Sequence, residues 1–428
     1  MSESFLQQLS SFGQRFCADS GTFTLMDDLG KALTVNPDML FLGGGNPARI
    51  EAVEYEIKLA LEAILAAPDG IQKMYGNYQS PQGDPEFLEA LASYFQRHCG
   101  WPVTSANIAL ANGSQAAFFV LFNMFAGDFE DGSRKQVLLP MAPEYIGYSS
   151  SGLCDEFFCS VKPQIEILPG NQFKYHVDFD QLPLSDPGAS QGIGAVCLSR
   201  PTNPTGNVIS DDELARLSAL ACARQVPLII DAAYGLPFPG ILFSDAGAPW
   251  DDNTVYMLSL SKIGLPGVRT GIVVANPEVI AAYTKANTAL NLACSSAGPA
   301  LAKHWLQNDH INTISRQMVQ PYYAQASRTA IELITNACAD LPVKIHAPQG
   351  AIFLWLWCQD LPISSQELYQ RLKTRGVLVL SGHHFFIGLE DSGWPHAQQC
   401  LRITYCQPRP VLEQAVAILA DELTQVYG

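Results

Sequence analysis

The stretch Leu228-Ile229-Ile230-Asp231-Ala232-Ala233-Tyr234 decides how this chain folds, because it is an apolar run that ends at a carboxylate. A short run of leucine and isoleucine without polar alternation is typical of a strand buried on both faces of a parallel sheet. Ligands of such sheets bind beyond the carboxyl ends of the strands, which is where Asp231 is expected. By itself, a strand-terminal Asp that only caps the next turn explains this stretch equally well.

Similar short apolar runs lie on both sides of this stretch and alternate with segments of helical pattern. Strands are predicted at residues 107–111, 136–139, 194–199, 227–231, 255–259 and 271–275, and helices at 115–125, 146–154 and 211–222. Alternation of this kind from about residue 105 to residue 290 predicts an α/β domain with a mostly parallel sheet.

The C-terminal third has a different pattern and predicts a second, smaller α+β lobe. Residues 300–339 form a long amphipathic stretch, expected to be a connecting helix with one or two breaks; a strand at 351–357, a helix at 365–374 and a strand at 401–405 follow. Residues 1–50 are expected to be an irregular arm that packs on the small domain or on a partner subunit. The predicted division is therefore arm 1–50, large domain 51–298 and small domain 299–428.

Composition excludes several classes of partner. The net charge of −16 argues against a nucleic-acid partner, since phosphate contacts need clustered Lys and Arg. The longest apolar run, residues 351–358, is too short to span a bilayer, so no membrane contact is expected. The 428 residues, 48% of them hydrophobic, suffice for two packed lobes.

Cysteine usage and the first residues predict a cytoplasmic protein. The eleven cysteines are an odd number without a Cys-x-x-Cys pair, as expected for reduced, buried thiols. Residues 1–8 lack the charged and apolar regions of a signal peptide. His383, His384 and His396 lack metal-ligand spacing, so no metal site is expected.

A lysine follows the predicted strand 255–259, in Ser259-Leu260-Ser261-Lys262. Taken alone, the tetrapeptide is more typical of a surface lysine in a serine-rich turn. Arg269, between Gly267 and Gly271, changes the interpretation, because its guanidinium can bind a phosphate bidentately while the glycines let backbone come close. Ser259 and Ser261 can donate to the same phosphate.

Three further side chains complete a set suited to one cofactor. Asp231 can keep a pyridine nitrogen protonated, and Tyr234 and Asn203 can donate to a phenolic oxygen. Asn203 lies in Pro201-Thr202-Asn203-Pro204-Thr205-Gly206, where it could instead be only a turn former. An amine at Lys262 that forms a Schiff base with an aldehyde, together with these groups, suits pyridoxal 5′-phosphate (PLP).

Other candidate contacts follow predicted strands or lie in turns. Gly113, Ser114 and Gln115 open the helix 115–125, where free N–H groups and a positive dipole favour an anion. Tyr145 is placed to stack on a flat ring, although a core or interface tyrosine is an alternative. Arg402 lies among apolar neighbours and needs an anion, which a substrate carboxylate or a structural acid could supply. The loop with Gly45 and Asn46 could close on a substrate, or merely turn.

Together these motifs resemble those of the fold-type-I, class-I/II aminotransferases, and the resemblance covers most of the chain. It implies a PLP enzyme with a large and a small domain, with Lys262, Asp231 and Tyr234 in catalytic roles. It also implies a homodimer in which Tyr78, in Tyr78-Gln79-Ser80-Pro81-Gln82-Gly83, reaches the phosphate of the neighbouring subunit. Two positions depart from the family: Arg200 stands where asparagine is frequent, and the spacing from Lys262 to Arg269 is one residue shorter than usual.

A narrower resemblance within the family rests on the long stretches 42–48, 112–119, 142–148, 201–209, 237–241 and 351–357. It implies a ping-pong exchange of an amino group between L-valine, or a similar apolar amino acid, and pyruvate, with Lys262 as the proton-transfer base. Gly45, Asn46, Asn203 and Arg402 would bind the amino acid and 2-oxo acid substrates.

Rival functions share the same set of cofactor-binding residues. A β-lyase or a cyclopropane-forming synthase on this scaffold is an open alternative, since side-chain selection lies in loops. A PLP-binding regulator is a second alternative, although no basic DNA-binding segment is visible. A nicotinamide dehydrogenase is disfavoured because the chain has no Gly-x-Gly-x-x-Gly.

Overall fold

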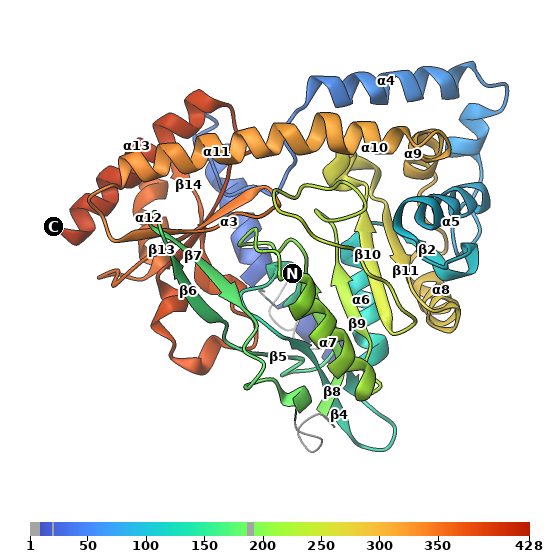
Figure 1. The fold of residues 1–428 in the computed structure, drawn as a ribbon, viewed down its shortest axis with the longest axis horizontal. Coiled ribbons are helices and arrows are strands. Elements are labelled where there is room, and N and C mark those ends of the chain that lie inside the picture. The colour runs from blue at the N-terminus through green and yellow to red at the C-terminus, as the bar shows by residue number, and fades with distance from the viewer. Residues whose placement is uncertain (1–8, 19–20, 186–191) are drawn as a thin grey trace.

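The computed structural model describes residues 9–18, 21–185 and 192–428, and it shows two lobes, each built around its own sheet (Figure 1). The large lobe holds an eight-stranded sheet and the small lobe a six-stranded one. Within the described parts of the chain, no helix is long and apolar enough to cross a membrane. Residues 1–8 and 19–20 of the predicted N-terminal arm lie outside the described residues.

The large-lobe sheet confirms all six strands predicted for it. Its order is β2-β11-β10-β9-β8-β4-β3, with β5 paired to β4. Pairs β4–β5, β4–β8, β8–β9 and β9–β10 are parallel, whereas β11 runs antiparallel to β10 and β2, and β3 antiparallel to β4. The strands are β2 (Ile108–Ala111), β3 (Gly127–Asp128), β4 (Arg134–Leu139), β5 (Phe158–Ser160), β8 (Ile193–Ser199), β9 (Leu228–Asp231), β10 (Thr254–Ser259) and β11 (Gly271–Val274).

Helices cover both faces of this sheet, as the unbroken burial of β8, β9 and β10 requires (Figure 1). Two predicted helices are confirmed, α6 (Ser114–Phe125) and α7 (Asp211–Ala223). The side chain of Ser210 accepts from the backbone N–H of Glu213, whose carboxylate accepts in return, so α7 begins with a capping box. The other helices of this lobe are α4 (Glu51–Ala66), α5 (Pro85–Cys99) and α8 (Pro277–Asn291).

The helix predicted at residues 146–154 is wrong: only a 3₁₀ turn, Ile146–Tyr148, forms there. The serines after it bond backward to the main chain instead of extending a helix, with Ser149 Oγ donating to the carbonyl of Ile146 at 2.8 Å and Ser151 Oγ to that of Gly147 at 3.3 Å. Such local side-chain bonds compete with helix formation.

The connecting helix is confirmed, with breaks, as α9 (Ala297–Gln307), α10 (His310–Thr313), a π-helical turn at Ile314–Val319 and α11 (Gln320–Ala337). In Figure 1, α11 runs from the large lobe across to α13 (Arg409–Tyr427) on the small lobe. The predicted helix α12 (Ser365–Thr374) is confirmed. So are the predicted strands, found as β13 (Phe353–Cys358) and β16 (Cys400–Thr404).

The small-lobe sheet also contains two strands from far upstream. Its order is β15-β16-β13-β12-β7-β6, where β15 is Leu380–Ser381, β12 is Val343–His346, β7 is Gln172–His176 and β6 is Gln164–Leu168. The hairpin β6–β7 joins this sheet through parallel pairing of β7 with β12. Residues of the region between β5 and β8 therefore complete the sheet of the other lobe.

The expectation that residues 1–50 are irregular is wrong for much of the described part. Helices α2 (Ser11–Cys17) and α3 (Gly21–Val35) form there, and β1 (Leu40–Phe41) pairs with β14 (Val377–Leu378) in the small lobe. Asp28 on α3 accepts from Tyr369 and Lys373 of α12, so this helix is held on the small lobe by polar contacts.

Candidate active site

A cavity of about 530 Å³ lies where the carboxyl ends of the large-lobe strands face the small-lobe sheet. Asn203, Asp231 and Lys262 reach it from the loops or strand ends at β8, β9 and β10, and Arg402 reaches it from β16. Thirteen of the fifteen residues predicted for the site line this one cavity: Gly45, Asn46, Ser114, Gln115, Tyr145, Asn203, Asp231, Tyr234, Ser259, Ser261, Lys262, Arg269 and Arg402.

The other two predicted residues, Gly113 and Tyr78, do not line the cavity. Gly113 lies directly behind it with φ +87°, and a Cβ at this position would come within 2.3 Å of Arg269 Nη2. The Arg269 guanidinium thus packs on the backbone at the start of α6, which only glycine permits. Tyr78 is 86% exposed on the surface of its own chain.

Asp231 ends β9 and is held by two hydrogen bonds. Tyr148 donates to Oδ2 at 2.7 Å, and the backbone N–H of Ala233 donates to Oδ1 at 3.0 Å. Burial raises the pKa of Asp231 to about 6, against the opposing effect of these two bonds and of Lys262. Sequence reasoning missed Tyr148; its only signal is its place three residues after Tyr145.

Lys262 lies in the 3₁₀ turn Ser261–Ile263 that follows β10. Its Nζ donates to the carbonyl of Gly45 and lies 5.2 Å from the ring centroid of Tyr234. Burial lowers the pKa of Lys262 to about 8. An amine that gives up its proton this readily can act as a nucleophile and as a base near neutral pH.

Arg402 is buried in the middle of β16 and is only 4% exposed. Nη1 donates to Asn203 Oδ1 at 2.9 Å and Nη2 to the carbonyl of Gly43 at 2.8 Å, while the buried Nε has no hydrogen-bond partner among the described residues. Both acceptors are uncharged, and burial lowers the pKa of Arg402 to about 10. A buried cation with a free donor and only neutral hydrogen-bond acceptors is suited to bind an anion.

A second buried carboxyl, Glu144, braces the turn that carries Asn203 and was also missed. Glu144 accepts from the backbone N–H of Ser199 at 2.9 Å and from the Ser199 hydroxyl, and Ser199 Oγ accepts from the backbone N–H of Asn203 at 3.3 Å. Burial raises the pKa of Glu144 to about 8. Glu144 therefore acts on the site through Ser199.

Five apolar side chains also line the cavity, and we refer to them together as the apolar wall. They are Met26, Leu29, Phe41, Ile146 and Leu380. These side chains come from α3, β1, the turn after Tyr145 and β15, segments too far apart in the chain for their proximity to be predicted from the sequence. Such a wall suits an apolar substrate side chain rather than a second carboxylate.

Comparison with known proteins identifies the family. Residues 52–419 match the family described as Aminotransferase class I and II. The chain is 46% identical to the valine–pyruvate aminotransferase of Escherichia coli (strain K12) over 419 residues, which are 98% of this chain and 99% of the relative.

This chain belongs to the class I and II aminotransferases.

Solved structures of high similarity agree with this assignment. A putative amino-acid aminotransferase from Psychrobacter arcticum superposes with a TM-score of 0.95 at 44% identity, covering 98% of this chain and 99% of the other. A valine–pyruvate aminotransferase from Salmonella typhimurium superposes with a TM-score of 0.87 at 44% identity, covering 95% and 99%. The fold is therefore PLP-dependent fold type I, as the sequence resemblance implied, and the protein is a transaminase.

Proposed function

We propose that the protein transfers an amino group between L-valine, or a similar apolar amino acid, and pyruvate, giving 3-methyl-2-oxobutanoate and L-alanine. The observation that carries the reaction type is one cavity that holds a lysine of lowered pKa and a buried arginine for which the described residues supply no anionic partner. The substrate pair is supported by the full-length likeness to valine–pyruvate aminotransferase and by the apolar wall.

The residues present fit PLP, the cofactor of this family. The contact of Arg269 with the glycine backbone at 113, beside the first turn of α6, makes a cradle for a phosphate. Ser114, Gln115, Ser259 and Ser261 would add donors, and Tyr78 of a second copy is proposed to reach the same phosphate. When bound, PLP supplies an aldehyde that takes up the amino group and a ring that withdraws electrons from the substrate's α-carbon.

The chain's own residues would hold the ring and move the proton. Asp231, fixed by Tyr148, would keep the proton on the ring nitrogen. Tyr234 and Asn203 would donate to the phenolic oxygen, and Tyr145 would lie against the ring. Lys262 would anchor the cofactor and, once displaced by the substrate amine, carry the α-proton as a base.

Arg402 is proposed to bind the α-carboxylate of the substrate. Amino acid and 2-oxo acid both carry this group and would occupy the site in turn, as a ping-pong cycle requires. A carboxylate would give the free Nε its acceptor and the buried guanidinium its counter-charge. The backbone at Gly45 and Asn46 would close over the bound substrate from the side of Lys262.

The decisive experiment is a substrate panel with the purified protein and PLP. Pyruvate is supplied with each amino acid in turn, and the 2-oxo acids and alanine formed are identified, with Lys262→Ala as the matched control. We expect 3-methyl-2-oxobutanoate from valine, and no product from aspartate at equal concentration. Release of ammonia or a ring-closed product in place of equal amounts of alanine and 2-oxo acid would assign a lyase or synthase instead.

We further propose a homodimer with shared active sites. Exposed apolar side chains cluster on α4 and the segment after it: Tyr55, Leu59, Leu61, Leu65, Ile71, Tyr75 and Tyr78. A surface of this kind is typical of a two-fold interface. Sedimentation with Tyr78→Phe and an interface variant, Leu59→Asp, tests it; a fully active monomer would contradict the proposal.

A cytoplasmic location is proposed on cysteine usage. All eleven cysteines are free, and five of them are buried. Buried thiols without disulfides are expected of a protein kept in a reducing compartment. Fractionation of the source cells would test the location.

A further inference from the structure

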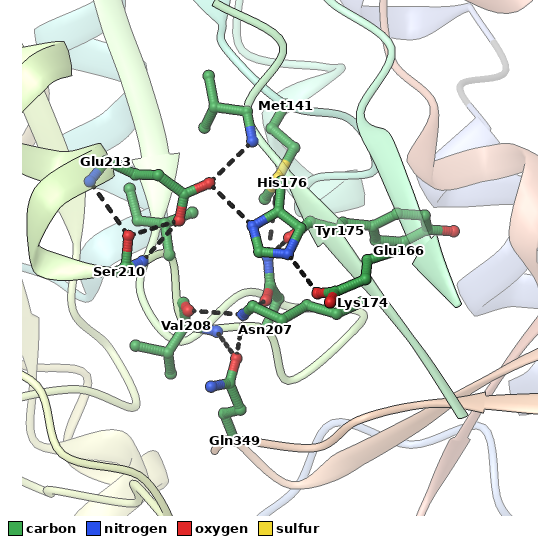
Figure 2. Close-up of polar contacts among 12 residues, drawn as sticks. Met141, Glu166, Lys174, Tyr175, His176, Asn207, Val208, Ser210, Glu213 and Gln349 are labelled. Atoms are coloured by element: carbon green, nitrogen blue, oxygen red, sulfur yellow. Dashed lines mark hydrogen bonds and ion pairs between the residues drawn. The ribbon is translucent and has the colours of Figure 1, made fainter. Parts of the chain in front are cut away.

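Lys174 lies at the centre of β7 and has no place in the reaction outlined above. Its Nζ donates to Asn207 Oδ1 at 2.7 Å, to the carbonyl of Val208 at 3.0 Å and to Gln349 Oε1 (Figure 2). An ammonium group has three donors, so these bonds use all of them. All three acceptors are uncharged, and the nearby carboxylates Glu166 and Glu213 pair with His176 instead. Lys174 is half-buried, and the removal of a cation from water costs free energy that hydrogen bonds to neutral groups offset only in part.

Two of the three acceptors, Asn207 and Val208, belong to the turn that carries Asn203, residues 202–208. Asn207 closes this turn, because its carbonyl accepts from the backbone N–H of Thr202 at 2.8 Å. Its side-chain amide also donates to the carbonyl of Tyr175, next to Lys174, at 3.1 Å. Gln349 reaches the turn from the other side, since its backbone N–H donates to the carbonyl of Gly206 at 3.0 Å.

The same turn meets the small-lobe sheet at a second point, where Arg402 donates to Asn203 at 2.9 Å. Lys174 on β7 and Arg402 on β16 are members of one sheet, separated by β12 and β13. The large-lobe turn is therefore bound to the small-lobe sheet by two cations. Loss of the Lys174 bonds would remove one of these two charged ties and leave the Asn203–Arg402 contact beside the neutral Asn207–Tyr175 and Gln349–Gly206 bonds.

We propose that Lys174 is a positioning residue for the substrate site, whose ammonium group fixes the turn 202–208 on the small-lobe sheet and so holds Asn203 against Arg402. This inference rests on the proposed role of Arg402 as the carboxylate site. Displacement of that pair by a fraction of an ångström would weaken carboxylate binding without removing any group that contacts the substrate.

The charge on Lys174 is sensitive to pH in a range that can be measured. Burial lowers the pKa of Lys174 to about 8, opposed by Glu213 and Glu166 and assisted by Arg200. Glu166 lies on β6, Glu213 on α7, Arg200 at the end of β8, and His176 and His346 on β7 and β12. Above this pKa the amine keeps two N–H donors for three acceptors, so the turn loses part of its support and the KM for both substrates should rise.

The first test compares Lys174→Met with Lys344→Met, which removes a lysine from the adjacent strand β12. Binding of 3-methylbutanoate to the PLP-loaded protein is measured by calorimetry at pH 7, beside KM, kcat and Tm. We expect Kd and both KM values to rise about tenfold in Lys174→Met, with a smaller change in kcat and no such change in Lys344→Met. A lower Tm with unchanged Kd and KM, or no change at all, overturns the proposal.

A second variant decides the matter if Lys174→Met does not fold. Gln349→Glu gives Lys174 a carboxylate partner, which raises its pKa, so the alkaline rise in KM should begin at higher pH than in the wild type. An unshifted rise overturns the proposal. Failure of the valine–pyruvate reaction itself is a separate outcome, because the calorimetric Kd does not depend on turnover.

Discussion

The large-lobe sheet and the small-lobe sheet each supply part of the candidate site, but in different ways. In the large lobe, Asp231 and Lys262 lie at or just after the end of a buried strand, each in a short recognisable motif. In the small lobe, Arg402 lies in mid-strand, and its surroundings come from Gly43, Asn203 and Phe353, all distant in the chain. Short local motifs therefore point to Asp231 and Lys262, whereas the hydrogen-bond partners of Arg402 are visible only in the assembled fold.

The two lobes also differ in how their charged side chains are paired. On the large-lobe side, Asp231 is a carboxylate whose partners, Tyr148 and the backbone at Ala233, are already in place. On the small-lobe side, the buried Arg402 and the half-buried Lys174 are cations that donate to neutral acceptors. We infer that the large-lobe side of the cavity is organised for a ligand that stays bound, and the small-lobe side for a substrate that binds and leaves in each cycle.

Replacement of Lys262 should have the largest effect on turnover. Lys262→Ala is expected to lower turnover by at least about 10³-fold with the fold intact, because we propose that the same amine anchors the cofactor and carries the proton. Turnover and circular dichroism check this. A variant with the wild-type rate would exclude Lys262 from the reaction. It would also contradict the inference that the large-lobe side holds a permanently bound ligand.

Arg402→Ala should rank next and act on binding. Loss of a buried charged contact is expected to cost about 2–5 kcal/mol, seen as higher KM for both amino acid and 2-oxo acid while PLP stays bound. Steady-state kinetics and Tm are measured together, with Arg402→Lys as the conservative control. A fall in Tm without a change in KM would make Arg402 a structural residue.

Asp231→Asn should act on kcat rather than KM. An amide cannot keep the ring nitrogen protonated, and the loss of one preorganised charge is expected to cost roughly 10²-fold. Cofactor absorbance and kcat check this expectation. A rate within about twofold of the wild type would reduce Asp231 to a strand-terminal turn residue.

Tyr148→Phe should lower kcat less, and its pH dependence should show that Tyr148 acts on Asp231. Loss of one hydrogen bond costs about 1 kcal/mol, or about fivefold in rate. The Tyr148 bond lowers the pKa of Asp231, which burial raises to about 6. Its removal should therefore move the acidic limb of the kcat profile to higher pH. An unchanged acidic limb of the kcat profile would show that Tyr148 contributes only to packing and does not affect the pKa of Asp231.

Acid should lower the stability of the protein through His396, a buried histidine of the small lobe. Burial lowers the pKa of His396 to about 3, so between its unfolded value near 6.5 and 3 the unfolded chain binds more protons. Stability is then complete above pH 6.5 and is lost as the pH falls toward 3. Melting curves from pH 7 to 4.5 should fall less steeply for His396→Asn than for the wild type, with the exposed His304→Gln as control.

Much of the large lobe could be predicted because its signals are short and local. Apolar runs bounded by turn residues gave all six strands, and the capping residues at Ser210 marked the start of α7. The helix at residues 146–154 failed because serine side chains bonded to the backbone, a competition that periodicity does not report.

The remaining site residues could not be predicted because their roles depend on tertiary packing. Glu144 and Tyr148 act through Ser199 and Asp231, and nothing in the sequence indicates those pairings. Leu29 lines the cavity from α3, a helix that Asp28 ties to α12 far along the chain. In the sequence, Lys174 looks like any lysine on an alternating strand. The positioning role that we propose for it follows from its bonds to the turn 202–208.

The β6–β7 hairpin ties the order of folding to the whole length of the chain. β7 pairs with β12, so residues near 172 and 345 must meet before the small sheet is continuous. A fragment beginning at residue 299 would leave the free edge of β12 unpaired, and unpaired edges promote aggregation. During synthesis, the hairpin waits for a partner strand made more than 150 residues later, a long-range contact of the kind that slows folding.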